Sequence, residues 1–185
     1  MTKLVFILLS SLSFIASAED FTECWYVPKD KDAEVHEPHC LTLNTATGDA
    51  LVSKRVTDSL AYDNDKLASI RTGDGFLWLN SEGRGRQVLT YDNGPDYFAE
   101  GLARSRQNGK VGYFDRSLKM VVSPQYDFGF PFNSGLAIVC NVCVEQSDGE
   151  HKMLVGGKWG AIDRQGVVVH AIRYTSDEIR RLVKD

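Results

Sequence analysis

Apolar and polar positions follow the same order in three successive segments of the chain. Each segment carries a Leu-Ala pair in a short extended run, and the pairs are spaced 35 and then 34 residues apart. The pairs are Leu67-Ala68, Leu102-Ala103 and Leu136-Ala137. A fixed period between about 20 and 50 residues is the signature of a repeat architecture.

Two further markers keep the same register as the Leu-Ala pairs. A turn-and-strand segment and a tyrosine each recur three times, with spacings of 35 and 48 residues. The segments are 74–80, 109–115 and 157–163, and the tyrosines are Tyr91, Tyr126 and Tyr174. The longer second spacing indicates an insertion near residues 140–156.

Each unit is predicted to contain three antiparallel strands joined by two tight turns. A Gly-Lys pair is expected to make the first turn, because glycine takes positive φ at little cost. An Asp or Asn closes the second strand, where its side chain can bond the backbone two residues on. These residues are Asn80, Asp115 and Asp163. The third strands are expected at 87–90, 120–123 and 167–170, and Pro124 is expected to end the second of them because proline cannot donate to a ladder.

The fold class that follows is all-β: tandem antiparallel β-hairpin repeats, three degenerate units of about 35 residues over 51–174, with a short C-terminal capping helix. That helix is expected at 175–185, where Thr175 or Ser176 can cap it and Glu178 stands at the capping-box position from Thr175. Its apolar stripe is expected to close the open end of the array. A partner-binding helix is the alternative.

The repeated segments resemble the WG-repeat family. The residues that carry the likeness are Gly109, Lys110, Gly112, Tyr113 and Asp115 in the second unit, and Gly157, Lys158, Trp159, Gly160 and Asp163 in the third. The likeness spans roughly 56–174 and is weak in the first unit, where Leu77 replaces a glycine and Trp78 falls two places late. The family implies β-hairpin repeats in bacterial proteins, often exported, with no common catalytic activity.

The first eighteen residues have the layout of a secretory signal peptide. Lys3 supplies a positive start, Leu4 to Ile15 is apolar apart from serines, and cleavage is expected after Ala18. The apolar run is too short to span a bilayer stably, so a membrane anchor is the less favoured alternative. Signal residues 1–18 would be removed, which leaves a periplasmic or secreted chain of 185 − 18 = 167 residues without a membrane span.

The net charge of the chain and its lack of catalytic motifs argue against several classes of function. The mature chain has a formal charge of (21 − 1) − 25 = −5 and no basic run, so no nucleic-acid partner is expected. No hydrolase, metalloprotease or phosphate-loop motif is present, so we expect a non-enzymatic protein without a cofactor. The short basic sequence 83–86 is interpreted as a solvated loop. The partner is expected to be another protein or an envelope component.

All four cysteines lie in the mature chain, which favours disulfides in an exported protein. Cys24 and Cys40 stand in two predicted strands, 24–27 and 40–43, around a polar loop at 28–39. A bridge between them would staple this N-terminal segment, 19–50, and contribute about 3 kcal/mol by loop entropy. The pairing stays open here, because four cysteines allow three arrangements.

Cys140 and Cys143 form a Cys-x-x-Cys pair at the start of the insertion. In a straight strand their side chains would face opposite sides, so a mutual bond needs a local turn or bulge. A structural disulfide is favoured over thiol–disulfide exchange, which usually places the pair at a helix N-terminus. Zinc bound by these cysteines with His151, or by Cys24 and Cys40 with neighbouring histidines, is a further alternative.

The insertion and the aromatic side chains are the candidate recognition features. Insertions in repeat proteins form loops on one face, so 140–156 is expected to carry specificity for a partner. Trp78 and Tyr97 could stack on a sugar or a peptide. Repeated apolar positions more often fill the shared interior, and we expect these aromatics to do so.

Overall fold

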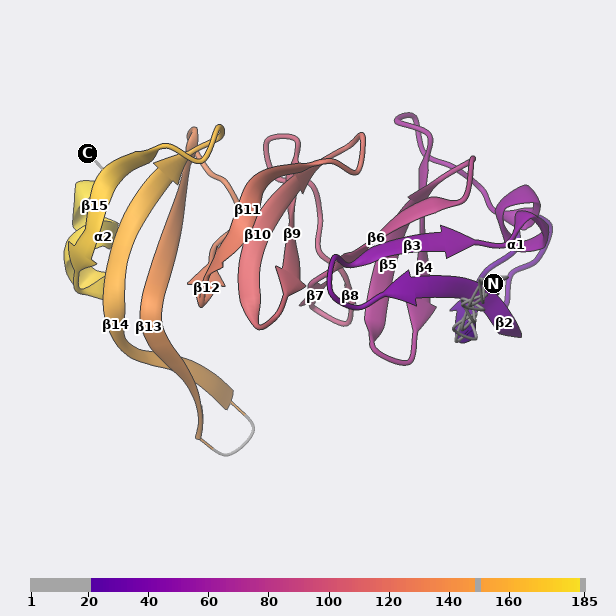
Figure 1. Ribbon diagram of the computed structural model, residues 1–185, viewed down its shortest axis with the longest axis horizontal. Coiled ribbons are helices and arrows are strands. Elements are labelled where there is room, and N and C mark those ends of the chain that lie inside the picture. Colours follow the sequence, from indigo (N-terminus) through magenta and orange to yellow (C-terminus); the bar gives the residue numbers. More distant parts are fainter. Residues whose placement is uncertain (1–20, 149–150, 184–185) are drawn as a thin grey trace, which may run out of the picture.

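The computed structural model describes residues 21–148 and 151–183 and consists mainly of antiparallel strands, which confirms the all-β class. The predicted signal peptide lies outside these residues. Figure 1 shows an elongated row: a barrel at the N-terminal end, two further sheets beside it, and a helix at the far end. Among the described residues, no helix has the length and apolarity needed to cross a membrane.

Six strands form the closed barrel, in the hydrogen-bonded order β1-β2-β3-β6-β5-β4. They are β1 (Phe21–Tyr26), β2 (Val35–Asn44), β3 (Asp49–Val52), β4 (Leu67–Thr72), β5 (Gly75–Asn80) and β6 (Arg84–Val88). The last three are the strands of the first repeat unit. The N-terminal segment therefore shares one sheet with the first repeat. The polar loop predicted at 28–39 is shorter than expected, because β2 already begins at Val35.

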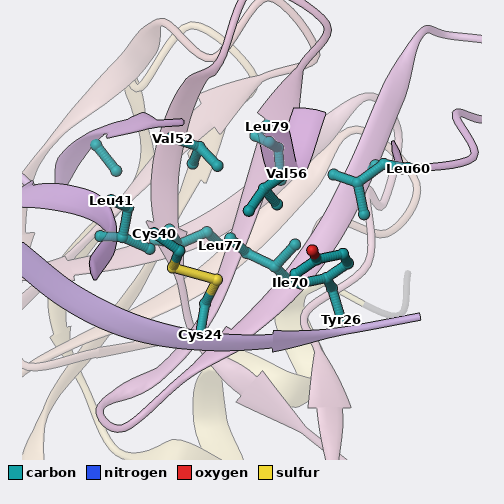
Figure 2. Close-up of a cluster of buried hydrophobic side chains, with 12 residues drawn as sticks. Cys24, Tyr26, Cys40, Leu41, Val52, Val56, Leu60, Ile70, Leu77 and Leu79 are labelled. Carbon is teal, nitrogen blue, oxygen red and sulfur yellow. A yellow bond between two sulfur atoms is a disulfide. The ribbon is translucent and has the colours of Figure 1, made fainter. Parts of the chain in front are cut away.

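The barrel interior is a hydrophobic core that contains a disulfide between Cys24 and Cys40 (Figure 2). The short helix α1 (Lys54–Ser59) buries Val56 completely in this core. The bridge joins β1 to β2, as the predicted staple requires. Such a bridge stabilises a small barrel because it limits the conformational freedom of the unfolded chain.

The second and third repeat units each form a three-stranded meander, as predicted. Their strands are β9 (Leu102–Gln107), β10 (Lys110–Asp115) and β11 (Met120–Tyr126), then β13 (Leu136–Asp148), β14 (His151–Asp163) and β15 (Val168–Tyr174). Connecting segments contain β7 (Thr90–Tyr91), β8 (Gly94–Pro95) and β12 (Phe128–Gly129), and β12 pairs with β13.

The predicted Asp and Asn turns are confirmed in all three units. The Oδ1 atom of Asp115 accepts the backbone N–H groups of Ser117 and Lys119, at 2.8 and 3.1 Å. Asn80 and Asp163 accept bonds from the corresponding positions. Burial alone would raise the pKa of Asp115, but the bonds from Ser117 and Lys119 hold this pKa below its usual value. The recurring carboxylates are thus engaged in turn formation.

Pro124 does not end its strand, and this expectation is wrong. β11 continues through it to Tyr126. The strand is at the edge of its sheet, and the pairing with β10 shifts register around Gly112, opposite Pro124. An edge strand with a bulge can hold a proline because the ladder is already interrupted there.

Adjacent units pack through shared hydrophobic clusters. Tyr113 and Val122 of the second unit meet Val139 and Ile162 of the third, and all four are buried. The Tyr113 hydroxyl donates to the carbonyl of Phe130 at 2.8 Å, and burial raises the pKa of this tyrosine. Each sheet therefore covers a face of the next, which is how a repeat array builds one continuous interior.

The terminal helix α2 (Ser176–Leu182) covers the last sheet, as predicted. Its capping box is complete: the Thr175 hydroxyl accepts from the Glu178 N–H, and the Glu178 carboxylate accepts from the Thr175 N–H at 2.8 Å. Ile179 is fully buried in a cluster with Trp159 and Ala161. The helix thus packs on the protein's own core.

Candidate functional site

The insertion forms a projecting two-stranded arm, which we define as residues 141–148 and 151–156. β13 and β14 pair in one register from Leu136↔Asp163 to Asp148↔His151, with Val142 and Gly157 left out of the ladder. The pairing of β15 with β14 goes no further toward the arm than Trp159. The arm extends beyond the body of its sheet in Figure 1. The expected loop is therefore wrong in form, because the inserted residues lengthen two strands that already pair.

The arm exposes large apolar side chains. Val142 is 74% exposed, Val144 62% and Met153 53%. Val144 pairs with Val155, and Gln146 pairs with Met153. Because side chains alternate between the two faces along a strand, these four share one face of the ribbon. A two-stranded ribbon with an uncovered apolar face gains free energy if a second surface covers that face.

A disulfide between Cys140 and Cys143 lies at the base of the arm. The backbone of Val142 is left-handed, with φ of 60°, so the two cysteines can meet although the ladder register is unchanged on either side. This is the local turn that the sequence required. The bridge lies inside a strand, and Cys140 is completely buried.

Gly157 lies directly beneath this disulfide. Its φ is 79°, and a Cβ atom there would be 2.5 Å from the Cys140 Sγ and 2.7 Å from the Cys143 Cβ. The Gly-Lys turn expected at 157–158 is wrong, because β14 runs through both residues and the insertion has moved the end of the hairpin away. In the second unit the turn lies one residue earlier than predicted, at Asn108 and Gly109 with φ of 49° and 76°, and Lys110 already begins β10.

Asp127 lies before the third unit and forms hydrogen bonds to the base of the arm, and we call these contacts the clasp. Its carboxylate accepts bonds from the Lys110 ammonium at 2.5 Å and from the Val142 N–H at 2.6 Å. The Asp127 N–H donates to the Cys140 carbonyl at 2.9 Å. The bond from Lys110, together with that from Val142, holds the pKa of Asp127 below its usual value. Disulfide, glycine and clasp together fix the direction of the arm.

We expect the clasp to open in acid. A carboxyl group whose pKa is lower in the folded than in the unfolded state stabilises the fold fully above the unfolded pKa. This contribution is lost as the pH falls through the folded pKa, which for Asp127 lies below 3.8. An NMR titration should therefore show the Val142 amide shifting with an apparent pKa below 3.8.

The matched control is Asp127→Asn, which keeps the shape but removes the titrating group. This variant should abolish the acid shift of Val142. An apparent pKa above 3.8 in the unmodified protein, or an unchanged titration in the variant, would contradict the assigned clasp.

The other residues of the repeat signature lie between closely packed strands, in the interior or in the ladder of the third unit. A Cβ on Gly112 would be 2.5 Å from the Val122 carbonyl, and one on Gly160 would be 2.5 Å from the His170 carbonyl. Both glycines permit close approach of neighbouring strands. Trp159 is buried and donates its indole N–H to the Gly156 carbonyl at 3.0 Å. The Lys158 backbone pairs with Asn141 in the arm ladder.

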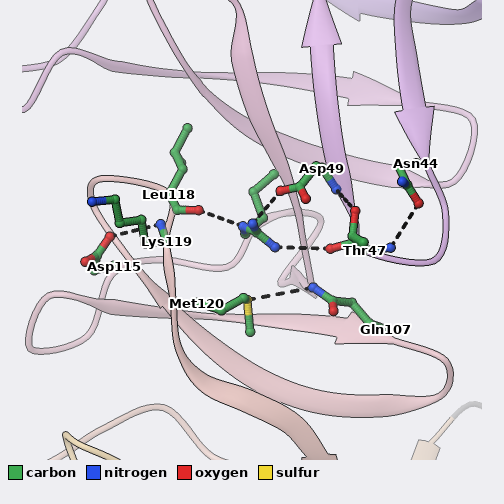
Figure 3. Close-up of polar contacts among 9 residues, drawn as sticks. Asn44, Thr47, Asp49, Gln107, Asp115, Leu118, Lys119 and Met120 are labelled. Atoms are coloured by element: carbon green, nitrogen blue, oxygen red, sulfur yellow. Dashed lines mark hydrogen bonds and ion pairs between the residues drawn. The ribbon is translucent and has the colours of Figure 1, made fainter.

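A groove of about 570 Å³ lies where the barrel meets the second unit. In Figure 3, Thr47 and Asp49 on the barrel side face Leu118 of the Asp115 turn. Arg86 bonds the carbonyls of Leu118 and Thr47 at 2.8 and 3.1 Å and also pairs with Asp49. The interpretation of 83–86 as a solvated loop is wrong. Arg86 is buried and joins the barrel to the second unit.

The expectation that Trp78 and Tyr97 fill the interior is confirmed for Trp78 and wrong for Tyr97. Trp78 packs against Phe98 and donates to the Asp96 carbonyl at 2.9 Å, so it is part of the interior. Tyr97 is 47% exposed and contacts Tyr91 edge to face.

No free cysteine occurs in the part of the chain that the structure describes. Over the same residues, no group of three or more His, Cys, Asp or Glu side chains is placed to hold a metal ion. His36 stacks on Trp25 and bonds Glu23 at 2.8 Å. Both cysteine pairs are disulfides, so neither supplies a thiolate ligand.

Comparison with known families confirms the resemblance carried by the repeats. Residues 112–141 match the family model described as WG containing repeat. The matched stretch begins in β10, passes through β11 and β12, and ends at the first residue of the arm. It therefore spans the junction between the second and third sheets. Neither a curated protein nor a solved structure matches the chain.

Proposed function

We propose that this repeat protein is exported to the bacterial envelope, is non-enzymatic, and binds another protein through the arm. The observation that carries the proposal is the exposed apolar face of Val144 and Met153 on a ribbon whose base is fixed. A fixed ribbon loses little conformational entropy on binding, so its apolar area contributes more fully to affinity.

The side chains of the repeats and those of the arm differ in what they do, and this difference supports the proposal that the arm binds the partner. The aspartates that recur with the period, Asp115 and Asp163, form turns, and Tyr113 and Trp159 form the interior. The arm is the feature that breaks the period. Insertions into repeat arrays are common places for recognition, because they change one unit without disturbing the packing between units.

Thiol exchange at Cys140 and Cys143 has less support. An attacking thiolate must be accessible and have a lowered pKa, as at a helix N-terminus. Here Cys140 has no exposed surface, and the pair lies within β13. The disulfide is better suited to bracing the arm.

Export is tested by the intact mass of the protein purified from the exported fraction. We expect a chain that begins at Glu19 and in which no cysteine alkylates without a reductant. A full-length chain confined to the cytosol, or cysteines that alkylate in the native protein, would contradict the proposal.

Binding is tested by quantitative co-purification from the exported fraction. The arm variant Val144→Ser with Met153→Ser is compared with the control Val121→Ser, which alters an exposed valine on β11. We expect a protein retained by the wild type and the control to be reduced at least about tenfold by the arm variant, because apolar hot spots contribute more than about 1 kcal/mol each. Equal retention by all three proteins would rule the arm out as the binding surface.

A further inference from the structure

The groove where the barrel meets the second unit is built in part by the N-terminal segment, which widens the sheet of the first unit. β6 is the third strand of the first unit, and it pairs with β3, which pairs in turn with β2. The corresponding strand of the second unit, β11, lies at the edge of its sheet. The outer face of β2, β3 and β6 forms one side of the groove, and the turn at 115–119 forms the other (Figure 3).

The side chains on this outer face stand in two cross-strand rows. Burial alternates along β3, so Asp49 and Leu51 face outward. Asp49 lies opposite Arg86, and Leu51 lies opposite Arg84. The first row is closed, because Arg86 is buried and bonds both Asp49 and the second unit. The second row is open, since Leu51 is 64% exposed and the Arg84 side chain is 75% exposed.

Basic side chains outnumber acidic ones in the groove. Over the residues that the structure describes, its charged lining consists of Arg84, Arg86 and Lys119 on one side of the balance and Asp49 on the other. Asp49 already pairs with Arg86, so Arg84 and Lys119 supply an excess of positive charge. The mature chain as a whole is acidic, which makes the groove a basic site on an acidic protein. A cleft that carries charge of one sign attracts ligands of the opposite sign.

Two carboxylates outside the lining lie near these cations but leave them able to bind a ligand. Glu82 pairs with Arg84 at 3.5 Å, but both side chains are exposed, and a pair of this kind contributes little. Asp115 attracts the Lys119 ammonium, but its Oδ1 atom is held in the turn by backbone N–H groups. A guanidinium has five N–H donors and an ammonium three, so both cations keep donors for an incoming carboxylate.

We propose that this groove, which we call the basic groove, binds an acidic segment of another protein in an extended conformation. A carboxylate of the segment pairs with Arg84 and Lys119, and an apolar side chain two residues away packs on Leu51. Side chains two residues apart in an extended chain lie on one face, about 6.5 Å from each other. The Cβ atoms of opposed cross-strand residues such as Leu51 and Arg84 are about 5 Å apart, so one segment reaches both.

The chemistry of the lining favours a peptide over an acidic polysaccharide. Among the described residues, those that line the groove include no aromatic ring on which a sugar could stack. The exposed apolar group is the aliphatic side chain of Leu51, which suits another aliphatic side chain. The basic groove lies between the barrel and the second unit, whereas the arm belongs to the third unit. The inference therefore does not rest on binding by the arm.

An NMR titration of the mature protein with a synthetic peptide tests the proposal. The probe is the end-capped peptide Leu-Ser-Glu-Ser-Leu-Ser-Glu, and the control peptide carries Gln in place of each Glu. We expect the acidic peptide to shift the amide resonances of Leu51, Arg84 and Lys119, and the control peptide to bind at least about tenfold more weakly. Added sodium chloride should weaken binding of the acidic peptide. Unshifted resonances at these residues, or equal affinity for the two peptides, would overturn the proposal.

Variants of the protein separate the groove from general charge effects. Arg84→Gln with Lys119→Gln should raise the Kd of the acidic peptide at least about tenfold, and Leu51→Ser about three- to tenfold. The control, Lys31→Gln with Arg164→Gln, makes the same change in charge at exposed positions outside the groove and should bind as the wild type. Equal losses in the two double variants would show general attraction and contradict the site. Circular dichroism should show that all the variants keep the native fold.

Two further probes distinguish a protein segment from other anions. Inorganic phosphate and an oligomer of galacturonate are titrated under the same conditions. We expect each to bind at least about tenfold more weakly than the acidic peptide, because neither offers an aliphatic side chain to Leu51. Tighter binding of either probe at the same resonances would overturn the assignment to a protein segment.

Discussion

Replacing Asp96 by alanine is expected to lower the free energy of unfolding by about 3–5 kcal/mol. Asp96 has no exposed surface, and Arg104 is 6% exposed. The Asp96 carboxylate accepts from the Arg104 Nε and Nη2 at 2.9 and 2.7 Å, and from the Arg104 backbone N–H at 3.0 Å. Without the carboxylate, a guanidinium stays buried with too few acceptors.

The pair also joins successive units. Arg104 Nη1 donates to the Gly129 carbonyl at 3.0 Å, and the Asp96 backbone carbonyl accepts the Trp78 indole N–H at 2.9 Å. We therefore expect Asp96→Ala to loosen the contacts on both sides of the second unit. Denaturant unfolding followed by tryptophan fluorescence measures the loss.

The control removes both charges together. Asp96→Leu combined with Arg104→Met fills the volume with apolar atoms and leaves no unpaired ion, so it should destabilise the protein less than Asp96→Ala alone. A double variant as unstable as the single one would show that the destabilisation does not come from an uncompensated charge.

Replacing Gly157 by alanine is expected to lower the free energy of unfolding by about 2–5 kcal/mol. A left-handed backbone costs an alanine roughly 1–2 kcal/mol, and overpacking against the disulfide adds about 1–3 kcal/mol. The added Cβ would be 2.5 Å from the Cys140 Sγ and 2.9 Å from the Cys143 backbone, which cannot rotate away. Thermal unfolding of the oxidised protein measures the effect.

The neighbouring Gly156 is the matched control. Its φ is 66°, and nothing lies within 4 Å of its added Cβ, so Gly156→Ala carries the backbone strain alone. We expect it to cost roughly 1–2 kcal/mol. Equal losses at the two positions would contradict close packing of the disulfide on Gly157.

The repeat units could be predicted because their signals are local. Asn80, Asp115 and Asp163 form the expected turns with the backbone that follows them, which requires no knowledge of distant residues. The capping box of Thr175 and Glu178 is local in the same sense. Each of these features depends on residues within four positions of each other.

Most of the features that sequence reasoning missed depend on distant partners. Closure of the barrel requires β1 to pair with β4 and β3 with β6, and neither pairing leaves a mark within one segment. Arg86 looked solvated because its acceptors, Thr47 and Leu118, are 39 and 32 residues away. One missed feature is local. Asp63 forms the same turn as Asp115, at the start of the first unit, but it does not follow the period.

The arm was half predicted. The change in spacing located the insertion, and Cys140 with Cys143 indicated a local turn, which Val142 supplies. The period contains no information on whether inserted residues form a loop or lengthen strands. The clasp from Asp127 was also missed, because its partners Lys110 and Val142 are 17 and 15 residues away.

Photo-crosslinking in living cells tests the central claim, that the arm is the binding surface. A photoreactive residue is placed at Val144 on the arm or, as the control, at Val121 on β11, both exposed. The account predicts a discrete adduct with another protein from position 144 and none from position 121. Adducts of equal yield from both positions, or from position 121 alone, would contradict it.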